Sequence, residues 1–299
     1  MPLIRPQVAP SRQLFTLAFS AASQLYKSTS LADQLERGEI HRGPNHDELL
    51  ARKKAPLFVR PEPNYPRHVP LYGFEKALLF AGSAIGAFLH PERNEFIVAL
   101  GESTALPCFL KQLKVQMLHD PTGRQILKER PYITSESLDL AKLKQYPDNT
   151  LARAYVDWLE KEGVSPDTRE PVRFIDDEEL AFIFQRYRQC HDFYHAITGL
   201  PIVREGEIAL KLFEFLNLKV PFAGLGALFA PIPIKKSQRR RLFNIYYPWA
   251  LKNSFTCKPL INVYWEKILD RDVDQLRHEL GIEKPPDMRQ LRKAKVTTL

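Results

Sequence analysis

The chain has 299 residues, 44% hydrophobic and 26% charged, which is typical of a soluble globular protein and excludes wholesale disorder and a fibrous repeat. Its three cysteines lie far apart and its 13 glycines form no phosphate-binding loop, which excludes a disulfide scaffold and disfavours the usual nucleotide-dependent enzymes. The net charge of +8 comes without a nucleic-acid-binding motif, so we expect no nucleic acid partner.

The amino-terminal segment, residues 1–32, contains no acidic residue and carries Arg5, Arg12 and Lys27 among serines and apolar side chains. This composition is typical of a mitochondrial transit peptide, and an ordinary amphipathic helix is the alternative. Residues 33–70 contain six prolines, which disfavour helix, so we expect an extended proline-rich arm there.

Residues 71–285 are predicted to form a single, mainly α-helical domain, because their apolar residues recur with helical period and few runs alternate as strands do. A basic tail over residues 286–299 follows it. The helices are expected at residues 75–90, 95–101, 105–120, 137–145, 150–162, 177–198, 204–218 and 262–280.

The most apolar stretch, residues 77–89, is shorter than the ~20 residues that a membrane-spanning helix needs. We therefore expect no transmembrane helix and interpret the stretch as a buried helix or one lying against a membrane. Its small residues, such as Ser83 and Gly86, would let a helix or a lipid chain approach closely, and plain helix packing is the alternative. The basic run at 235–241 is a candidate contact for anionic lipid headgroups.

The candidate chemistry concentrates in the helix expected at 177–198 and in the helix after it. His191 and His195 lie four residues apart, so both rings project from one face and can converge on one ion. Asp192 lies at the flank of that face, and Glu207 follows the tight turn and could reach the same ion. Two nitrogens and two oxygens suit zinc best, with manganese and iron as weaker choices.

Other interpretations of these residues stay open. A histidine pair on an apolar face can be satisfied by hydrogen bonds in the core, and Glu207 near the edge of its helix could simply be solvated. A metal phosphohydrolase needs further His and Asp residues, for which no supporting spacing exists. In a metalloprotease related to H-E-x-x-H, Asp192 would shorten the base by one methylene group.

The order H-D-x-x-H-x11-E, met by His191, Asp192, His195 and Glu207, resembles the zinc motif of the Coq4 family of ubiquinone-biosynthesis proteins. The resemblance covers about residues 65–283. The other segments that carry it are 76–86 with Ser83, Pro91, Arg93, 101–104, Gly206, Lys211, Glu214, 247–250 and 264–266.

This resemblance implies zinc bound by those four residues, in a peripheral protein on the matrix side of the mitochondrial inner membrane that works within the complex of ubiquinone-biosynthesis enzymes. It implies decarboxylation at C1 of a 4-hydroxy-3-methoxy-5-polyprenylbenzoate, oxidative in some accounts, and thus a carbon–carbon lyase. Asp192 is then either a ligand or the proton carrier, as the glutamate of H-E-x-x-H is. The alternative is a non-catalytic, lipid-binding scaffold with a structural zinc, and a homo-oligomer is compatible with either.

Overall fold

The computed structural model describes residues 60–90 and 93–286. The transit peptide expected at 1–32, most of the arm expected at 33–70 and nearly all of the tail expected at 286–299 lie outside the described residues. The chain divides into two compact units, 1–61 and 62–299, and the described part of the second is helical. Its described residues contain no β-strand, only an isolated antiparallel bridge between Thr150 and Asp272. The predicted mainly α fold with a single helical domain is confirmed.

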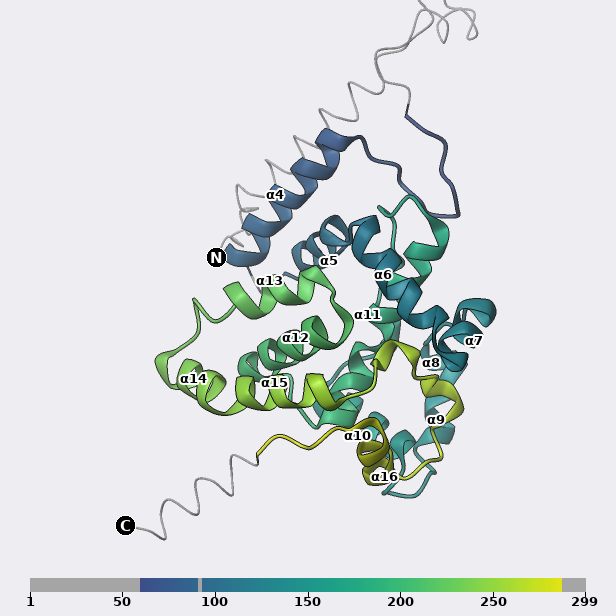
Figure 1. Cartoon of the computed structure of the whole chain (residues 1–299), viewed down its shortest axis with the longest axis vertical. Helices are drawn as coiled ribbons and strands as arrows, with labels where there is room; N and C mark the ends of the chain where they lie inside the picture. The colour runs from purple at the N-terminus through teal and green to yellow at the C-terminus, as the bar shows by residue number, and fades with distance from the viewer. Residues whose placement is uncertain (1–59, 91–92, 287–299) are drawn as a thin grey trace, which may run out of the picture. The chain divides into compact units, whose positions relative to one another are not determined.

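The helices run in the chain order shown in Figure 1. They are α4 (Gly73–Leu89), α5 (Asn94–Thr104), α6 (Pro107–Leu118), α7 (Pro121–Glu129), α8 (Ser135–Leu138), α9 (Leu140–Leu143), α10 (Leu151–Glu162), α11 (Glu178–Thr198), α12 (Arg204–Leu218), α13 (Pro221–Phe229), α14 (Lys236–Arg241), α15 (Tyr247–Thr256) and α16 (Val273–Leu280). Three 3-10 turns are η1 (Pro166–Thr168), η3 (Leu260–Asn262) and η4 (Trp265–Lys267), and the π turn η2 (Leu242–Tyr246) joins α14 to α15.

Most of the predicted helices are confirmed to within a few residues, but the one expected at 262–280 is wrong in its first half. Only Val273–Leu280 is α-helical there, and 3-10 turns occupy part of the preceding segment. The Asp272 carboxylate accepts hydrogen bonds from the backbone N–H groups of Asp274 and Gln275, which fixes the start of α16. The helix expected at 137–145 is divided into α8 and α9 at Asp139, whose backbone is left-handed (φ 50°).

Helix α11 lies at the centre of the domain, in contact with α6, α10, η3 and α16. From Leu180 to Thr198 every residue except Arg188 is buried, so the helix is covered on all sides and not only on the face that carries the two histidines. Asp177 caps the helix, since its side chain accepts a hydrogen bond from the backbone N–H of Leu180 at 2.9 Å.

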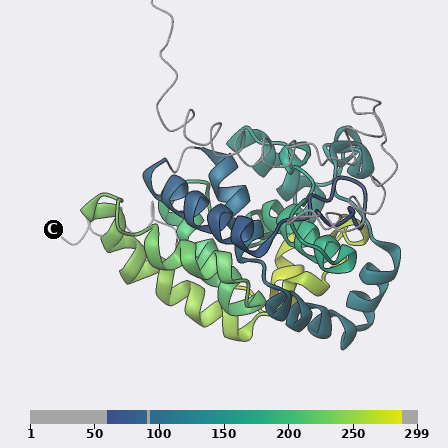
Figure 2. The same ribbon diagram turned by 90° about the horizontal axis from the view of Figure 1, so that it is seen from above.

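Helix α4 packs against α5, and α13 packs against α5 and α12 (Figures 1 and 2). The buried face of α4 consists of small residues. Ser83 and Gly86 are buried, and a Cβ atom at position 86 would collide with the Phe96 ring of α5. The close approach predicted at these small residues is thus made by another helix. No helix in the described part of the chain combines the length and apolar character needed to cross a bilayer.

Candidate metal centre

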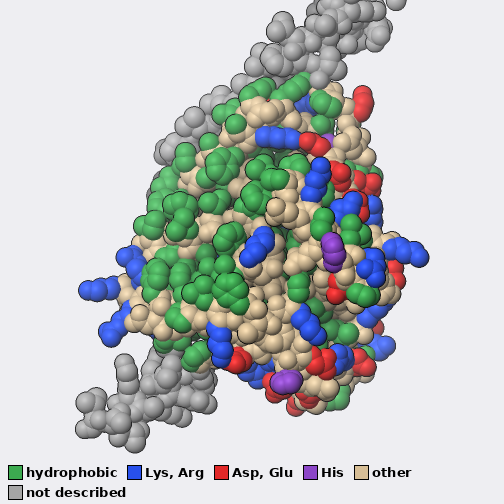
Figure 3. All heavy atoms as spheres, in the orientation of Figure 1, with side chains coloured by type: hydrophobic (Ala, Val, Ile, Leu, Met, Phe, Trp, Pro, Cys, Tyr) green, Lys and Arg blue, Asp and Glu red, His purple; other side chains and the backbone are tan. Residues whose placement is uncertain are grey.

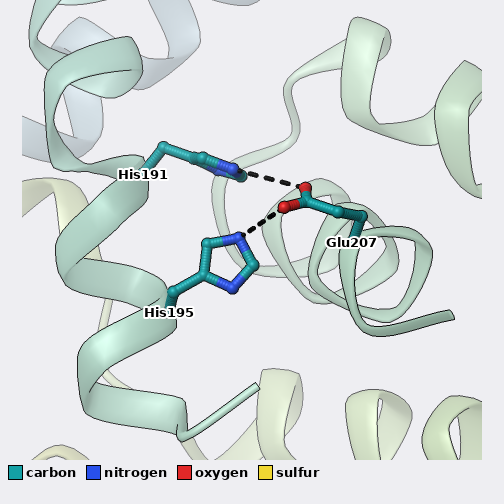
Figure 4. A group of neighbouring side chains, drawn as sticks. All are labelled: His191, His195 and Glu207. Atoms are coloured by element: carbon teal, nitrogen blue, oxygen red, sulfur yellow. Dashed lines mark ion pairs between the residues drawn. The ribbon is translucent and has the colours of Figure 1, made fainter. Parts of the chain in front are cut away.

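Three of the four predicted ligands meet between α11 and α12 (Figure 4). His191 and His195 project from successive turns of α11, and Glu207 projects from the first turn of α12 toward both rings. Glu207 Oε1 lies 3.0 Å from His195 Nε2, and Oε2 lies 3.5 Å from His191 Nε2. One ligand atom from each residue lies within 4.8 Å of the others, which is close enough to share one cation.

The turn between the two helices brings these residues together. Gly199 ends helix α11 in a left-handed backbone conformation (φ 75°). In this conformation its N–H donates a hydrogen bond to the carbonyl oxygen of His195, and the chain reverses direction. Gly206 then passes so close to the Pro201 carbonyl oxygen that a Cβ atom at position 206 would collide with it. This contact sets Glu207, the next residue, opposite the histidines.

The hydrogen bond on the far side of the His195 ring determines which nitrogen carries the proton. Nδ1 lies 2.9 Å from the Leu200 carbonyl oxygen, which can only accept, so Nδ1 is the donor. In the neutral ring, Nε2 therefore has a lone pair facing a carboxylate oxygen of Glu207, and it makes no hydrogen bond within the described part of the chain. Two acceptors 3.0 Å apart repel each other unless a cation or a proton lies between them.

His191 is oriented in the same way by a different partner. Its Nδ1 lies 2.6 Å from Oε1 of Glu214, a fully buried carboxylate that also accepts from Tyr187 Oη and Lys211 Nζ, both at 2.8 Å. The Nδ1–H of His191 donates to this carboxylate, which turns Nε2 toward Glu207. A histidine held by a carboxylate on one nitrogen with the other nitrogen exposed to a ligand site is the usual arrangement of metal-binding histidines.

The electrostatics of the group match this arrangement. Burial raises the pKa of Glu207, but the neighbouring His191 and His195 rings outweigh burial and hold it well below its usual value. Burial and the Lys211 ammonium lower the pKa of His191, but the Glu214 and Glu207 carboxylates outweigh both and raise it. The raised pKa of His191 favours its protonated form, and a metal that binds to its Nε2 must displace that proton.

Asp192, the fourth predicted ligand, lies outside this group. It is buried, and its Oδ1 accepts a hydrogen bond from Arg169 Nη2 at 2.5 Å. Its Oδ2 is buried too and has no hydrogen-bond partner among residues 60–90 and 93–286. The two roles expected of Asp192, ligand and proton carrier, therefore stay predictions.

Three residues around the site were not assigned a role from the sequence. Glu214 lies seven residues after Glu207, a helical spacing that puts both on one side of α12 and that could have indicated it. Trp158 on α10 stacks on His195 with the ring centroids 4.8 Å apart. Neither Trp158 nor Arg169 carries a spacing signal, because both come from separate segments that only the tertiary fold brings to α11.

The donor set fits a divalent metal that accepts imidazole and carboxylate ligands. Two imidazole nitrogens and one carboxylate are a known ligand set of catalytic zinc, in which the fourth position is left to water or substrate. The Glu207 side chain is 33% exposed, so the group is accessible from solvent on one side.

Comparisons with known proteins agree over most of the chain. The family described as "Coenzyme Q (ubiquinone) biosynthesis protein Coq4" matches residues 65–286. A protein of Komagataella phaffii is 67% identical over 278 residues, 93% of this chain and 92% of the relative. One of Debaryomyces hansenii is 60% identical over 270 residues, 89% of this chain and 84% of the relative. Both are named "Ubiquinone biosynthesis protein COQ4, mitochondrial".

A solved structure has a similar fold. It is the crystal structure of a protein from Nostoc punctiforme, provisionally described as a ubiquinone biosynthesis protein. The TM-score is 0.54 at 19% sequence identity, and the match covers 72% of this chain and 100% of that one. At this identity the likeness bears on the fold alone.

Proposed function

The chain belongs to the Coq4 family of ubiquinone-biosynthesis proteins, and from this premise we propose that it is a zinc-dependent decarboxylase. The proposed substrate is a 4-hydroxy-3-methoxy-5-polyprenylbenzoate, which loses its C1 carboxylate as carbon dioxide. His191, His195 and Glu207 are assigned as metal ligands, and Asp192 is assigned as the proton carrier, with ligation as its alternative role.

The observation that carries this proposal is the open group of three ligands. Structural zinc sites are almost always closed by four protein ligands, whereas catalytic sites keep one position for water or substrate. The Nε2 atoms of His191 and His195 face one carboxylate that is partly exposed, and Asp192 is occupied by Arg169. This arrangement favours a catalytic metal over the alternative of a scaffold with a structural zinc.

The residues of this chain would divide the chemistry among themselves. A bound zinc ion would supply Lewis acidity toward an oxygen atom of the substrate. Leu200 and Glu214 hold the two imidazoles in one orientation, so no reorganisation is needed when substrate binds. In its protonated form, Asp192 would deliver that proton to C1 and be left as the carboxylate that pairs with Arg169. The bond from C1 to the carboxylate then breaks, its electron pair returns to the ring, and carbon dioxide leaves.

The test measures metal and turnover separately in the purified full chain. Zinc-loaded wild type is expected to convert the prenylated benzoate to the decarboxylated phenol and carbon dioxide. His195→Ala is expected to lose both zinc and turnover, and Asp192→Asn is expected to keep zinc and lose turnover. The control is His278→Ala, an exposed histidine on α16, which should keep both. Zinc-loaded wild type that forms no product would favour the scaffold, and full turnover after metal removal would exclude the metal from the reaction.

The cellular setting is part of the same proposal. The names of the relatives place those proteins in mitochondria. For this chain we propose the matrix side of the inner membrane, in a complex with other ubiquinone-biosynthesis enzymes. A polyprenyl tail keeps its substrate in the bilayer, since each buried methylene contributes about 0.8 kcal/mol. The enzyme must therefore offer a surface to the membrane.

The outer face of α4 supports such a surface. The small residues of α4 face α5, and its large apolar side chains face outward, the reverse of the usual pattern of a soluble helix. Further exposed apolar residues follow on α13 and in the turn after it. The exposed residues of these segments are Phe74, Leu78, Phe80, Ile85, Phe88, Leu89, Leu228, Phe229 and Ile232. We call this set the apolar face, and Figure 3 shows apolar side chains gathered where α4 and α13 lie in Figure 1.

The basic run at 235–241 has two uses in this structure. Arg239 donates to the carbonyl groups of Pro231 and Ile232, and Arg241 pairs with Glu205, so these two residues support the local fold. Lys236 and Arg240 are exposed, and Figure 3 shows Lys and Arg side chains at the edge of the molecule where α14 lies. Lys236 and Arg240, together with the exposed Lys235, are therefore the members of the run available to anionic headgroups.

A further inference from the structure

A second ion pair, between Arg169 and Asp192, lies next to the candidate metal centre. Arg169 directly follows η1, where its backbone N–H bonds to the Pro166 carbonyl and fixes the position of the chain. Its Nη2 donates to Asp192 Oδ1 at 2.5 Å, and Asp192 is the neighbour of His191 in α11. A guanidinium group is thereby held one residue away from a metal ligand.

This pair leaves polar atoms unused on both partners. Arg169 Nε and Asp192 Oδ2 are buried, and neither has a hydrogen-bond partner in the described ranges. Buried polar groups are nearly always hydrogen-bonded, so the unused donor of Arg169 is available to an acceptor from another molecule. The Asp192 side chain is buried, with 1% of its surface exposed. The Arg169 side chain is 32% exposed, so a ligand can reach it from solvent.

The charge of Arg169 acts on the metal centre as well as on Asp192. Its Nη2 lies 2.5 Å from Oδ1 of Asp192, and the Glu207 and Glu214 carboxylates of the candidate centre also favour its charged form. A ligand bound by Arg169 would therefore lie beside Asp192, the residue next to the metal ligand His191.

We propose that Arg169 is a carboxylate-binding subsite of the metal centre, which takes the carboxylate of an aromatic acid. A guanidinium has five N–H donors in a planar fork that matches a carboxylate, and Asp192 engages one of them. The remaining donors can bind a second carboxylate without breaking the first pair. The inference deepens the proposed function and rests on it, because the bound carboxylate is the one that the reaction removes.

The alternative is a purely structural ion pair that holds the η1 segment to α11. The two roles differ in what they predict for ligand choice. A structural pair would affect stability when it is broken, but it would not change the preference between two ligands that differ only in a carboxylate. A carboxylate subsite sets that preference directly.

The experiment compares two probes on the zinc-loaded full chain by calorimetry. The probes are 4-hydroxy-3-methoxybenzoate and 2-methoxyphenol, the same ring without the carboxylate. We expect wild type to bind the acid about tenfold or more tightly than the phenol, since hydrogen bonds to charged groups are among the strongest in proteins. Arg169→Met is expected to bind the two probes with similar affinity while its zinc content stays that of wild type.

Arg153→Met is the matched control, because Arg153 pairs with Asp157 at 2.7 Å and has a similar exposure, 34%. It should keep the preference for the acid. If Arg169→Met does not fold, Arg169→Lys replaces it in the test. Lysine keeps the positive charge but lacks the planar set of N–H donors, so it should weaken the preference for the acid. A wild type without preference, or an Arg169 variant that keeps it in full, overturns the inference. Neither result touches the proposed function, which the turnover of wild type tests.

Discussion

At the scale of single residues, the centre is defined by groups that hold the ligands rather than by the ligands alone. Leu200 and Glu214 decide that the Nδ1 atoms of His195 and His191 are donors, and so leave both Nε2 atoms for a cation. The buried Glu214 carboxylate has a pKa of about 2, since Lys211 and His191 outweigh the effect of burial. It therefore stays ionised at any pH at which the protein would be assayed.

Glu214→Gln is the substitution that tests this role. The amide keeps the shape of the side chain but removes the negative charge that accepts the Nδ1–H of His191 and balances Lys211. Loss of such a partner typically weakens metal binding by about 10–100-fold. We expect that loss in a chelator competition assay, in a variant that still shows cooperative unfolding.

Tyr187→Phe is the control for Glu214→Gln. It removes a neutral hydrogen bond to the same carboxylate and leaves the contact with His191 in place. Its zinc affinity should fall less than that of Glu214→Gln. Equal zinc affinity in wild type and Glu214→Gln would contradict the orienting role of the carboxylate.

The sequence could indicate part of this site and not the rest, for a physical reason. His191 and His195 are related by helical spacing, and Glu207 follows a turn whose Gly199 and Pro201 are recognisable, so their meeting is a local property. Asp192 was expected at the same ion, but its partner Arg169 comes from a loop that precedes α11. Only the tertiary packing of that loop decides whether Asp192 faces the ion or the guanidinium.

At the scale of elements, prolines explain three of the helices that the sequence did not predict; the short α14, also not predicted, has no such proline. Helices α7, α13 and α15 each have a proline in their first two positions, Pro121, Pro221 and Pro248. Proline is favourable there because the first N–H groups of a helix have no intrahelical partner. In a sequence, proline usually indicates the end of a helix, so a helix that begins at a proline is easily missed.

The close contact between the start of α12 and the turn that precedes it leads to a prediction at this scale. Gly206→Ala would place a Cβ atom against the Pro201 carbonyl oxygen, and backbone cannot move aside as a flexible side chain can. The start of α12 must shift, and Glu207 shifts with it. We expect a lower melting temperature and a weaker affinity for zinc, measured by thermal unfolding and chelator competition.

Gly73→Ala is the matched control, because a Cβ atom at position 73 meets nothing within 4 Å. It lies in the first turn of α4, where alanine should leave the melting temperature and the zinc affinity close to those of wild type. If Gly206→Ala binds zinc as tightly as Gly73→Ala does, the turn is not what positions Glu207.

At the scale of the whole described domain, the exposed apolar residues and the exposed basic residues indicate one membrane-facing surface. Each large side chain of the apolar face contributes about 1.5–3 kcal/mol if it is fully buried, and each basic residue near an anionic surface contributes about 1 kcal/mol. The apolar term does not depend on salt, whereas the electrostatic term is screened within a Debye length of about 8 Å at physiological ionic strength. The two contributions can therefore be separated by experiment.

The test measures binding of the full chain to vesicles with and without an anionic phospholipid. The double variant Leu78→Asp with Ile85→Asp places charges on the outer face of α4, where both side chains are more than 60% exposed, so the fold should be kept. We expect it to lose binding to both kinds of vesicle. The double variant Lys236→Glu with Arg240→Glu should lose only the additional, salt-sensitive affinity for anionic vesicles. Lys128→Glu, an exposed residue of α7, should behave as wild type. The metal ligands are on α11 and α12 and not on α4 or α14, so zinc content should be unchanged in all three variants. Undiminished vesicle binding by the α4 variant would show that the apolar face serves another purpose.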